Sequence, residues 1–194
     1  MARHALDHID RLDAEIAAFD ARIEQELRRQ RHRQDLLSTI PGVARYTSEV
    51  ILAETGGDMT RFPTAAALAS WAGVAPGNNE SAGKNLSGAT RHGDAWLLGA
   101  LGDAAAAAAR TKGTYLGVYY KRMARRRGPQ RALVAVMHKI LVAVWHMLTR
   151  DMPYQDLGPE YFHNQPGQIE RRKRRLIHEL RELGVDTSAL TATA

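Results

Sequence analysis

The sequence predicts an all-α protein, in which a long N-terminal coiled-coil helix precedes a compact helical domain. Apolar residues recur at spacings of three and four along most of the chain, which is the period of an amphipathic helix. No stretch alternates well enough, or carries enough β-branched residues, to predict a strand. Because 44% of the residues are apolar but only 6% are aromatic, the core should be aliphatic and rich in alanine.

The charge and the composition narrow the possible partners and the compartment. The 194-residue chain has a formal net charge of +6 and a pI near 9.9, which favours an anionic partner such as nucleic acid. It has no cysteine, so disulfides and thiolate metal sites are excluded. No apolar run approaches the roughly 20 residues that cross a bilayer, and the N-terminus has no signal-peptide core. We expect a cytoplasmic protein that does not bind membranes.

Residues 3–34 are expected to form one helix with a narrow apolar stripe. The stripe follows the 3-4-3-4 spacing of a coiled-coil seam and consists of Ile9, Leu12, Ile16, Phe19 and Ile23. So narrow a stripe needs a partner, either a second copy of the chain or a neighbouring helix of the same chain. Residues 1–35 are therefore a candidate dimerisation helix for a homodimer or a higher oligomer.

The segment 36–54 is predicted to be a helix, a tight Pro41-Gly42 turn and a second helix. It resembles a helix-hairpin-helix, in which turn amides and the start of the second helix hold a phosphate. Gly42 and Arg45 are the candidate nucleic-acid-binding residues here. An ordinary helical hairpin explains the same pattern, and Ala44 stands where many phosphate-binding hairpins have glycine.

Further helices are expected at 65–71, 95–110, 114–126, 131–148 and 168–183, of which 131–148 is the most apolar and should form the centre of the core. Basic runs near two helix ends are usually solvated surfaces, but together they favour a nucleic-acid footprint. The candidate contacts in the first run are Lys121, Arg122, Arg125, Arg126 and Arg127. Residues 166–194 are interpreted as a basic C-terminal helix followed by a disordered tail.

The segment 76–94 is expected to be a loop of glycines, small polar residues and bases. A nucleophilic serine needs a group that takes its proton and a cation that stabilises the attacked group. Lys84 and Arg91 can supply the cations for Ser81 and can bind nucleic acid, but no histidine or aspartate is placed by the sequence as the base. On chemistry alone, an ordinary loop serine explains Ser81 as well as a catalytic one does.

The sequence offers no metal or cofactor site. His4 and His8 have the i, i+4 spacing of a helical zinc site, but Ala5 stands where the metalloprotease motif has its glutamate, and no third ligand is apparent. A two-metal nuclease site needs several converging carboxylates, and the 76–94 loop offers only Glu80 and Asp94.

Several motifs resemble the C-terminal transposase domain of the IS110/IS116/IS902 insertion-sequence family. The resemblance covers residues 36–165, and its most specific block is Pro76-Gly77-Asn78-Asn79-Glu80-Ser81-Ala82-Gly83-Lys84. Other parts are Leu37-x-x-Ile-Pro-Gly-Val, Leu68-Ala69-Ser70-Trp71-Ala72-Gly73-Val74-Ala75, Gly93-Asp94-Ala95-Trp96-Leu97 and Pro153-Tyr154-x-x-Leu157-Gly158.

The resemblance implies a DNA recombinase that works with a structured guide RNA. In the family a RuvC-like nuclease domain, which carries a metal-binding Asp/Glu set for an ion such as Mg²⁺, is joined to this helical domain, and a coiled coil pairs the protomers. The family serine that attacks a DNA phosphate maps onto Ser81.

Two departures from the family pattern suggest a chain that is inactive alone. The RuvC-like domain is not expected in this chain, which opens in the coiled coil and is interpreted as a truncated transposase. Asp94 and Leu98 stand where the family usually has Asn and Arg, so an anion is added and a cation is lost near the expected phosphate. The alternative to a transposase part is a non-catalytic, oligomerising nucleic-acid-binding module.

Overall fold

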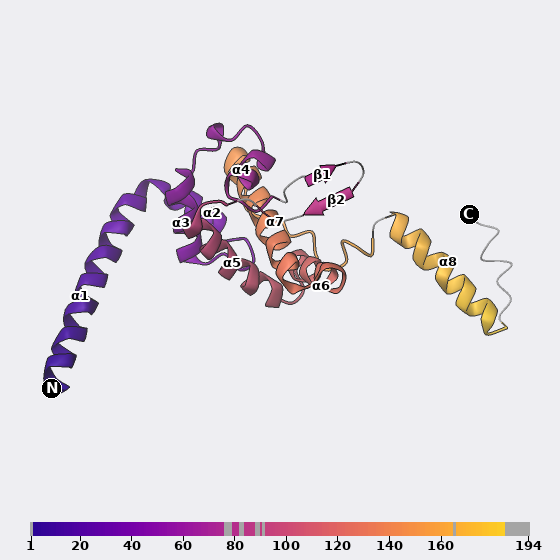
Figure 1. Ribbon diagram of the computed structural model, residues 1–194, viewed down its shortest axis with the longest axis horizontal. Helices are drawn as coiled ribbons and strands as arrows, with labels where there is room; N and C mark the ends of the chain where they lie inside the picture. Colours follow the sequence, from indigo (N-terminus) through magenta and orange to yellow (C-terminus); the bar gives the residue numbers. More distant parts are fainter. Residues whose placement is uncertain are drawn as a thin grey trace.

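The computed structural model describes residues 2–75, 79–81, 84–87, 90, 92–164 and 166–184. The fold is helical, as predicted, with one short β-hairpin, and Figure 1 shows its arrangement. The helices are α1 (Ala2–Leu27), α2 (Arg31–Leu37), α3 (Arg45–Thr55), α4 (Ala65–Trp71), α5 (Ala95–Arg110), α6 (Tyr115–Arg127), α7 (Pro129–Arg150) and α8 (Pro166–Glu182). Two 3-10 turns, η1 (Arg28–Gln30) and η2 (Met59–Arg61), and two strands, β1 (Asn79–Ser81) and β2 (Lys84–Ser87), complete the described elements.

Helix α7 is the centre of the core, as its apolar sequence predicts. It packs against α2, α4, α5 and α6, and its buried side chains are Ala132, Val136, Met137, Ile140, Leu141, Val144 and Met147. Pro129 is the first residue of the helix. A backbone N–H at this position would have no hydrogen-bond partner within the helix, so proline, which lacks the N–H, is tolerated there. Within the described residues, α7 is also the one helix whose length and composition would suit a membrane span, a property that core helices share.

Helix α5 lets other segments approach closely because its core face is made of alanine. Ala104 and Ala108 are buried there, and the turn before α3 packs against them at Gly42. A Cβ on Gly42 would lie 2.3 Å from the carbonyl oxygen of Ala104 and 2.6 Å from the backbone nitrogen of Ala108. The aliphatic, alanine-rich core expected from the composition is thereby confirmed, and the alanines serve helix packing.

The N-terminal segment is not the single helix 3–34 that the sequence predicts. The 3-10 turn η1 separates α1 from α2, and Gln30 leaves the helical region with φ −110° and ψ 9°. The physical reason is a change of environment, because Leu36 and Leu37 at the end of α2 are buried in the core, whereas α1 extends away from it (Figure 1). A straight helix would carry α2 away from its packing surface.

The segment after α7 folds back onto the core through Tyr161 and Phe162. Both rings are partly buried against the core. Tyr161 meets the Tyr115 ring of α6 edge to face at a centroid distance of 5.2 Å, and Phe162 stacks on the same ring at 5.3 Å. The segment is tied to the N-terminal half by a hydrogen bond from the Tyr154 N–H to the Thr39 hydroxyl, 2.9 Å long. The N-terminal half of the chain and the segment after α7 therefore contribute to the same core.

Candidate nucleic-acid interface

Ser81 lies on a β-hairpin that projects from the helical body on the side away from α1 (Figure 1). Strands β1 and β2 pair antiparallel, and Ser81, the last residue of β1, is the register partner of Lys84, the first residue of β2. The expectation of a strandless loop at 76–94 is therefore wrong in part. Strands of three and four residues are too short for the alternation by which a strand is recognised in sequence.

The segment just before α5 packs closely against the end of α4. Gly93 lies against the end of α4, where a Cβ on it would be only 2.3 Å from the carbonyl oxygen of Ala72. One residue later, the Asp94 carboxylate accepts a 2.7 Å hydrogen bond from the Leu97 N–H and caps α5. The end of α4 and the start of α5 therefore lie in close contact at Gly93.

Asp94 and Leu98, the two residues that differ from the family pattern near the hairpin, both have structural roles here. The Asp94 carboxylate is the N-terminal cap of α5, and an asparagine at this position could accept the same bond. Leu98 is partly buried and packs against the core. The stability of α5 thus explains both residues. Near the hairpin, Asp94 still adds a negative charge and Leu98 still lacks the positive charge of the family's arginine.

Arg91 lies outside the described residues, and for Ser81 and Lys84 the structure describes the backbone alone. The assignment of Ser81 as nucleophile and of Lys84 and Arg91 as its cations stays a prediction. His92, which follows Arg91, is exposed.

Gly42 and Arg45 both have local structural partners. Gly42 adopts φ +90° and packs against α5, so the fold needs glycine there whether or not the turn binds phosphate. Arg45, at the start of α3, donates a 2.7 Å hydrogen bond from Nε to Glu49 Oε1, and this bond raises the pKa of Arg45. A phosphate at this turn would compete with the Glu49 carboxylate, so phosphate binding here stays a prediction.

The predicted basic group on α6 is exposed and lies at its C-terminal end. Its members are Lys121, Arg122, Arg125, Arg126 and Arg127. The three last-turn arginines favour the negative end of the helix dipole, which is a structural reason for their presence. Arg122 also lies over the Phe162 ring, with 5.2 Å from its guanidinium carbon to the ring centroid.

Sequence reasoning missed Arg131 as a member of this basic surface. Arg131 is exposed in the first turn of α7, just across the Gly128 turn from the last-turn arginines of α6. A cation in the first turn opposes the helix dipole, so the fold gives no electrostatic reason for it. Its position after a basic run was the signal in the sequence.

An aromatic cluster stabilises the basic helix from its other side. Tyr115 and Tyr119 of α6 stack on Phe162 with centroid distances of 5.3 and 6.1 Å. Burial, with smaller effects of Tyr119 and Tyr161, raises the pKa of Tyr115 to about 12, so this phenol stays neutral at physiological pH. The cluster is therefore structural support for α6 and is a poor source of catalytic protons.

Trp96 is a second residue that sequence reasoning did not assign to the interface. It lies near the start of α5, two residues after Asp94, and is 72% exposed. Exposure of so large an apolar ring to water is unfavourable, and such a ring is suited to stacking on an unpaired base. Together with the hairpin, it makes this end of α5 a candidate contact for nucleic acid.

No three histidine or carboxylate groups of the described residues lie close enough to hold a metal ion. His8, half of the N-terminal histidine pair, has its Nδ1 2.9 Å from Nη2 of Arg11 instead. The divalent ion that the family implies does not fit the residues described here, and no catalytic step is derived through it.

The sequence of this region matches the model of a transposase family. Residues 34–121 match the family described as "Transposase IS116/IS110/IS902 family", a stretch that begins in α2 and ends in α6. The chain is also similar to the "Insertion element IS900 uncharacterized 42 kDa protein" of Mycobacterium paratuberculosis, with 35% identity over 139 residues. These residues are 71% of this chain and 34% of that protein, so the chain spans about a third of its relative.

Proposed function

The chain belongs to the IS116/IS110/IS902 transposase family, and we propose that it is the DNA-binding, serine-bearing part of a DNA recombinase that acts in transposition. The observation that carries this proposal is the position of Ser81 and Lys84. They are register partners on a projecting hairpin, within the segment that matches the family. The hairpin projects from the helical body (Figure 1), where a large substrate could reach it.

In the proposed reaction the Ser81 hydroxyl attacks a DNA phosphate. A bond forms between Oγ and phosphorus, the bond from phosphorus to one deoxyribose oxygen breaks, and that oxygen leaves with a proton. The serine proton passes to a base that the described residues do not supply. Cations beside the phosphate, Lys84 and Arg91, stabilise the charge that develops on its oxygens.

The DNA, and a structured guide RNA with it, would contact the exposed bases of α6 together with Arg131 and Trp96. Arginine side chains neutralise backbone phosphates and release counterions, whereas an exposed indole stacks on a base regardless of sequence. Arg45 and the Gly42 turn would add a further backbone contact. Such a surface binds by charge and stacking, which suits a protein whose target is chosen by a guide.

We propose further that the chain self-associates through α1, acts in the cytoplasm and cannot transpose alone. The apolar seam of α1 is exposed, and the described residues contain no cluster of carboxylates that could hold catalytic metal ions. A metal-binding part must therefore come from elsewhere. A non-catalytic nucleic-acid-binding module is the alternative, because the cap and packing roles of Asp94 and Leu98 do not require catalysis.

Covalent capture of DNA tests the role of Ser81. The chain is mixed with the metal-binding half of a homologous transposase and with labelled DNA, and protein–DNA adducts are counted on a denaturing gel. Ser81→Ala should abolish the adduct, whereas Ser87→Ala, on β2 of the same hairpin, should leave most of it. If the unsubstituted chain forms no adduct, or if Ser81→Ala still forms it, the catalytic proposal is wrong.

Salt dependence tests the binding surface separately from catalysis. The logarithm of the DNA affinity should fall linearly with the logarithm of the salt concentration, and each lost phosphate contact should lower the slope by about 0.9. Arg126→Gln and Arg131→Gln should each cause such a loss, whereas Arg22→Gln on α1 should not. Affinity that is flat over a roughly tenfold range of salt would exclude the electrostatic interface.

A further inference from the structure

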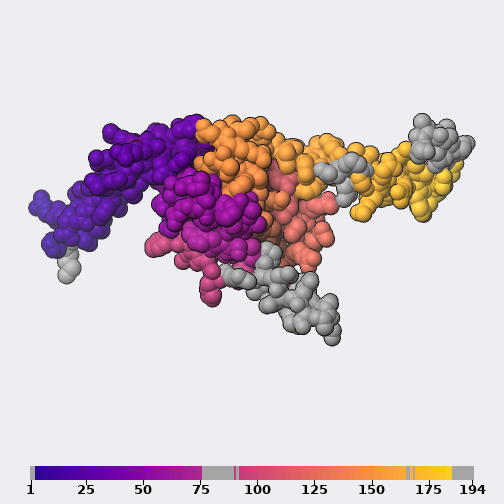
Figure 2. Space-filling model, turned by 90° about the horizontal axis from the view of Figure 1, so that it is seen from above, coloured from indigo at the N-terminus to yellow at the C-terminus, as the bar shows by residue number. Residues whose placement is uncertain are grey.

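Two helices of the described chain extend from the core with exposed apolar seams, and they lie at opposite ends of the molecule. Figures 1 and 2 show α1 as an arm at one end and α8 as an arm at the other. Apart from the junction of α1 with η1, neither helix belongs to the packed helix pairs of the core. Each therefore lacks the cover that an amphipathic helix needs.

The seam of α1 is apolar, regular and exposed. Its five residues, in the 3-4-3-4 spacing, are between 42% and 69% exposed, and they are Ile9, Leu12, Ile16, Phe19 and Ile23. In a heptad they occupy alternating a and d positions. Five large apolar side chains in one row favour burial against another helix.

Helix α8 carries a seam of the same period and the same length. Its positions are Ile169, Lys173, Leu176, Leu180 and Leu183, the last just beyond the helix end. Ile169 and Leu176 are 49% and 44% exposed. In a heptad these residues occupy d, a, d, a and d, so both seams span fifteen residues and can face each other along their length.

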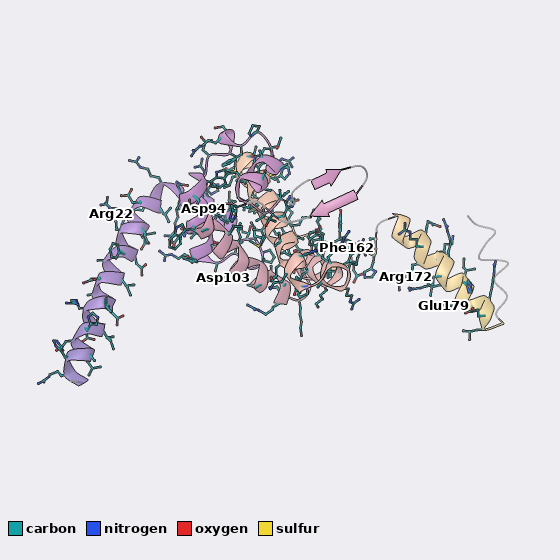
Figure 3. The ribbon with its side chains drawn as sticks, in the orientation of Figure 1. Arg22, Asp94, Asp103, Phe162, Arg172 and Glu179 are labelled. Carbon is teal, nitrogen blue, oxygen red and sulfur yellow. The ribbon has the colours of Figure 1, made fainter. Side chains whose placement is uncertain are left out.

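The charges of the two helices are opposite. Helix α1 has seven carboxylates and three arginines, whereas α8 has six lysines and arginines and three glutamates. Figure 3 labels Arg22 on α1, and Arg172 and Glu179 on α8, the two helices that extend on either side of the body. Such complementarity favours pairing of α1 with α8 over pairing of either helix with itself.

The heptad positions make parallel self-pairing of either helix unfavourable. In a parallel α1 pair, Glu15 at g would face Asp20 at e of the other copy, twice. In a parallel α8 pair, Lys173 would face its own copy at the a position, inside the seam. Like charges at these places oppose association.

A parallel α1–α8 pair removes both conflicts. When Leu12 is aligned with Ile169, the following layers are Ile16 with Lys173, Phe19 with Leu176 and Ile23 with Leu180. The same register puts Arg172 at g opposite Asp20 at e, and brings the Lys173 ammonium toward Glu15. The apolar layers and the flanking charges therefore agree on one register.

We propose that α1 of one copy of this chain packs in parallel on α8 of a second copy, with Leu12 aligned with Ile169. The proposal deepens the proposed self-association through α1 and is independent of nucleic-acid binding. It gives the basic C-terminal helix a protein partner, namely the acidic N-terminal helix of its neighbour.

Cysteine cross-linking of the full chain tests the pairing, because the chain has no cysteine of its own. Differently tagged copies of Leu12→Cys and Ile169→Cys are mixed without nucleic acid and oxidised mildly. They should form a disulfide-linked heterodimer, as should Phe19→Cys with Leu176→Cys. Leu12→Cys with Leu176→Cys, about 10 Å out of register along the helix, should not.

Other cross-linking results would overturn the pairing. A homodimer of Leu12→Cys alone would show α1–α1 association, which keeps self-association through α1 but excludes α8 as the partner. A variant that carries both Leu12→Cys and Ile169→Cys could instead form a disulfide within one copy at high dilution. That result would show that the two helices pair in the same chain. No cross-link together with a monomer in sedimentation would exclude both the pairing and self-association.

Charge reversal provides a second test that does not depend on disulfide geometry. Asp20→Arg should weaken self-association by about tenfold or more, and adding Arg172→Asp in the same chain should restore it. Asp10→Arg makes the same charge change at heptad position b of α1, outside the proposed contact, and is the matched control. Neither helix packs in the core, so the thermal midpoint of the body should not change, and a double variant that stays dissociated would contradict the proposal.

Discussion

The Asp156 carboxylate accepts a hydrogen bond from the backbone N–H of Tyr115, at 3.0 Å from Oδ1, across 41 positions of the sequence. The same oxygen accepts a 2.6 Å bond from the Gly158 N–H. One carboxylate thus satisfies a free amide at the start of α6 and holds the segment that follows α7 in its turn. This links the basic helix to the returning chain and keeps the aromatic cluster between them closed.

Asp156→Ala should therefore destabilise the protein by about 1–2 kcal/mol, the usual cost of losing a helix cap. The free energy of unfolding from urea denaturation measures the change. Asp156→Asn keeps an oxygen acceptor and should lose distinctly less. Equal losses for both variants would show that the charge matters more than the two hydrogen bonds.

Gly42→Ala should cost more than about 3 kcal/mol, because the new methyl group would meet the backbone of α5. Gly113→Ala is the matched control: Gly113 has φ +74° but no atom within 4 Å of a Cβ. The control should show only the cost of a left-handed alanine, about 1–2 kcal/mol. Similar losses in urea denaturation at both sites would mean that the turn moves away from α5 readily.

Much of this fold could be predicted from the sequence, because local signals and periodicity agreed. Helix α4 begins after Thr64, whose hydroxyl accepts the Ala67 N–H at 3.1 Å, and this cap is readable in the sequence. The break at η1 could not be predicted, since the heptad pattern fades there and only the core shows where Leu36 and Leu37 must go. The hairpin around Ser81 was missed because its strands, of three and four residues, are too short to show the alternation of apolar and polar residues that predicts a strand.

The site was less predictable than the fold. Asp94 was interpreted by its charge alone, although an aspartate three residues before Leu97 at a helix start is also a cap signal. Trp96 could not be assigned because exposure depends on which face of α5 packs against α3. Sequence indicates which residue types are present, whereas tertiary packing decides which of them reach solvent.

The stability of the protein should fall as the pH decreases below neutral, in part because of His138 on α7. Burial, with a smaller effect of Lys139, lowers the pKa of His138 below 6.5, so the unfolded chain binds this proton more tightly than the folded protein does. The contribution is fully present above pH 6.5, the ordinary pKa of histidine, and is lost as the pH falls from there through the lower pKa of His138 in the folded protein.

When the pH is lowered from about 7 to about 5, the free energy of unfolding of the His138→Phe variant should therefore fall by less than that of the unsubstituted protein. Urea midpoints at both values measure the difference, and His178→Gln on the exposed part of α8 serves as the control. If His138→Phe and the unsubstituted protein lose the same amount, another group dominates the acid sensitivity.

Two variants of Asp94 can separate its role as the cap of α5 from the effect of its negative charge beside the hairpin. Asp94→Ala removes the 2.7 Å bond to the Leu97 N–H and should cost about 1 kcal/mol of unfolding free energy. Asp94→Asn keeps an acceptor at the same place, so the stability should stay within a few tenths of a kcal/mol. The asparagine variant lacks the anion, however, and that difference can be measured on DNA.

Asp94→Asn should bind DNA about two- to fivefold more tightly at low salt, as expected when one exposed like charge near a phosphate is removed. The gain should shrink as salt is added, because screening weakens the repulsion that the aspartate exerts. Glu54→Gln, a charge-neutralising change at the end of α3, is the control for a general effect of net charge. If both variants gain equally, the DNA does not approach the start of α5, and the hairpin is not the centre of the interface.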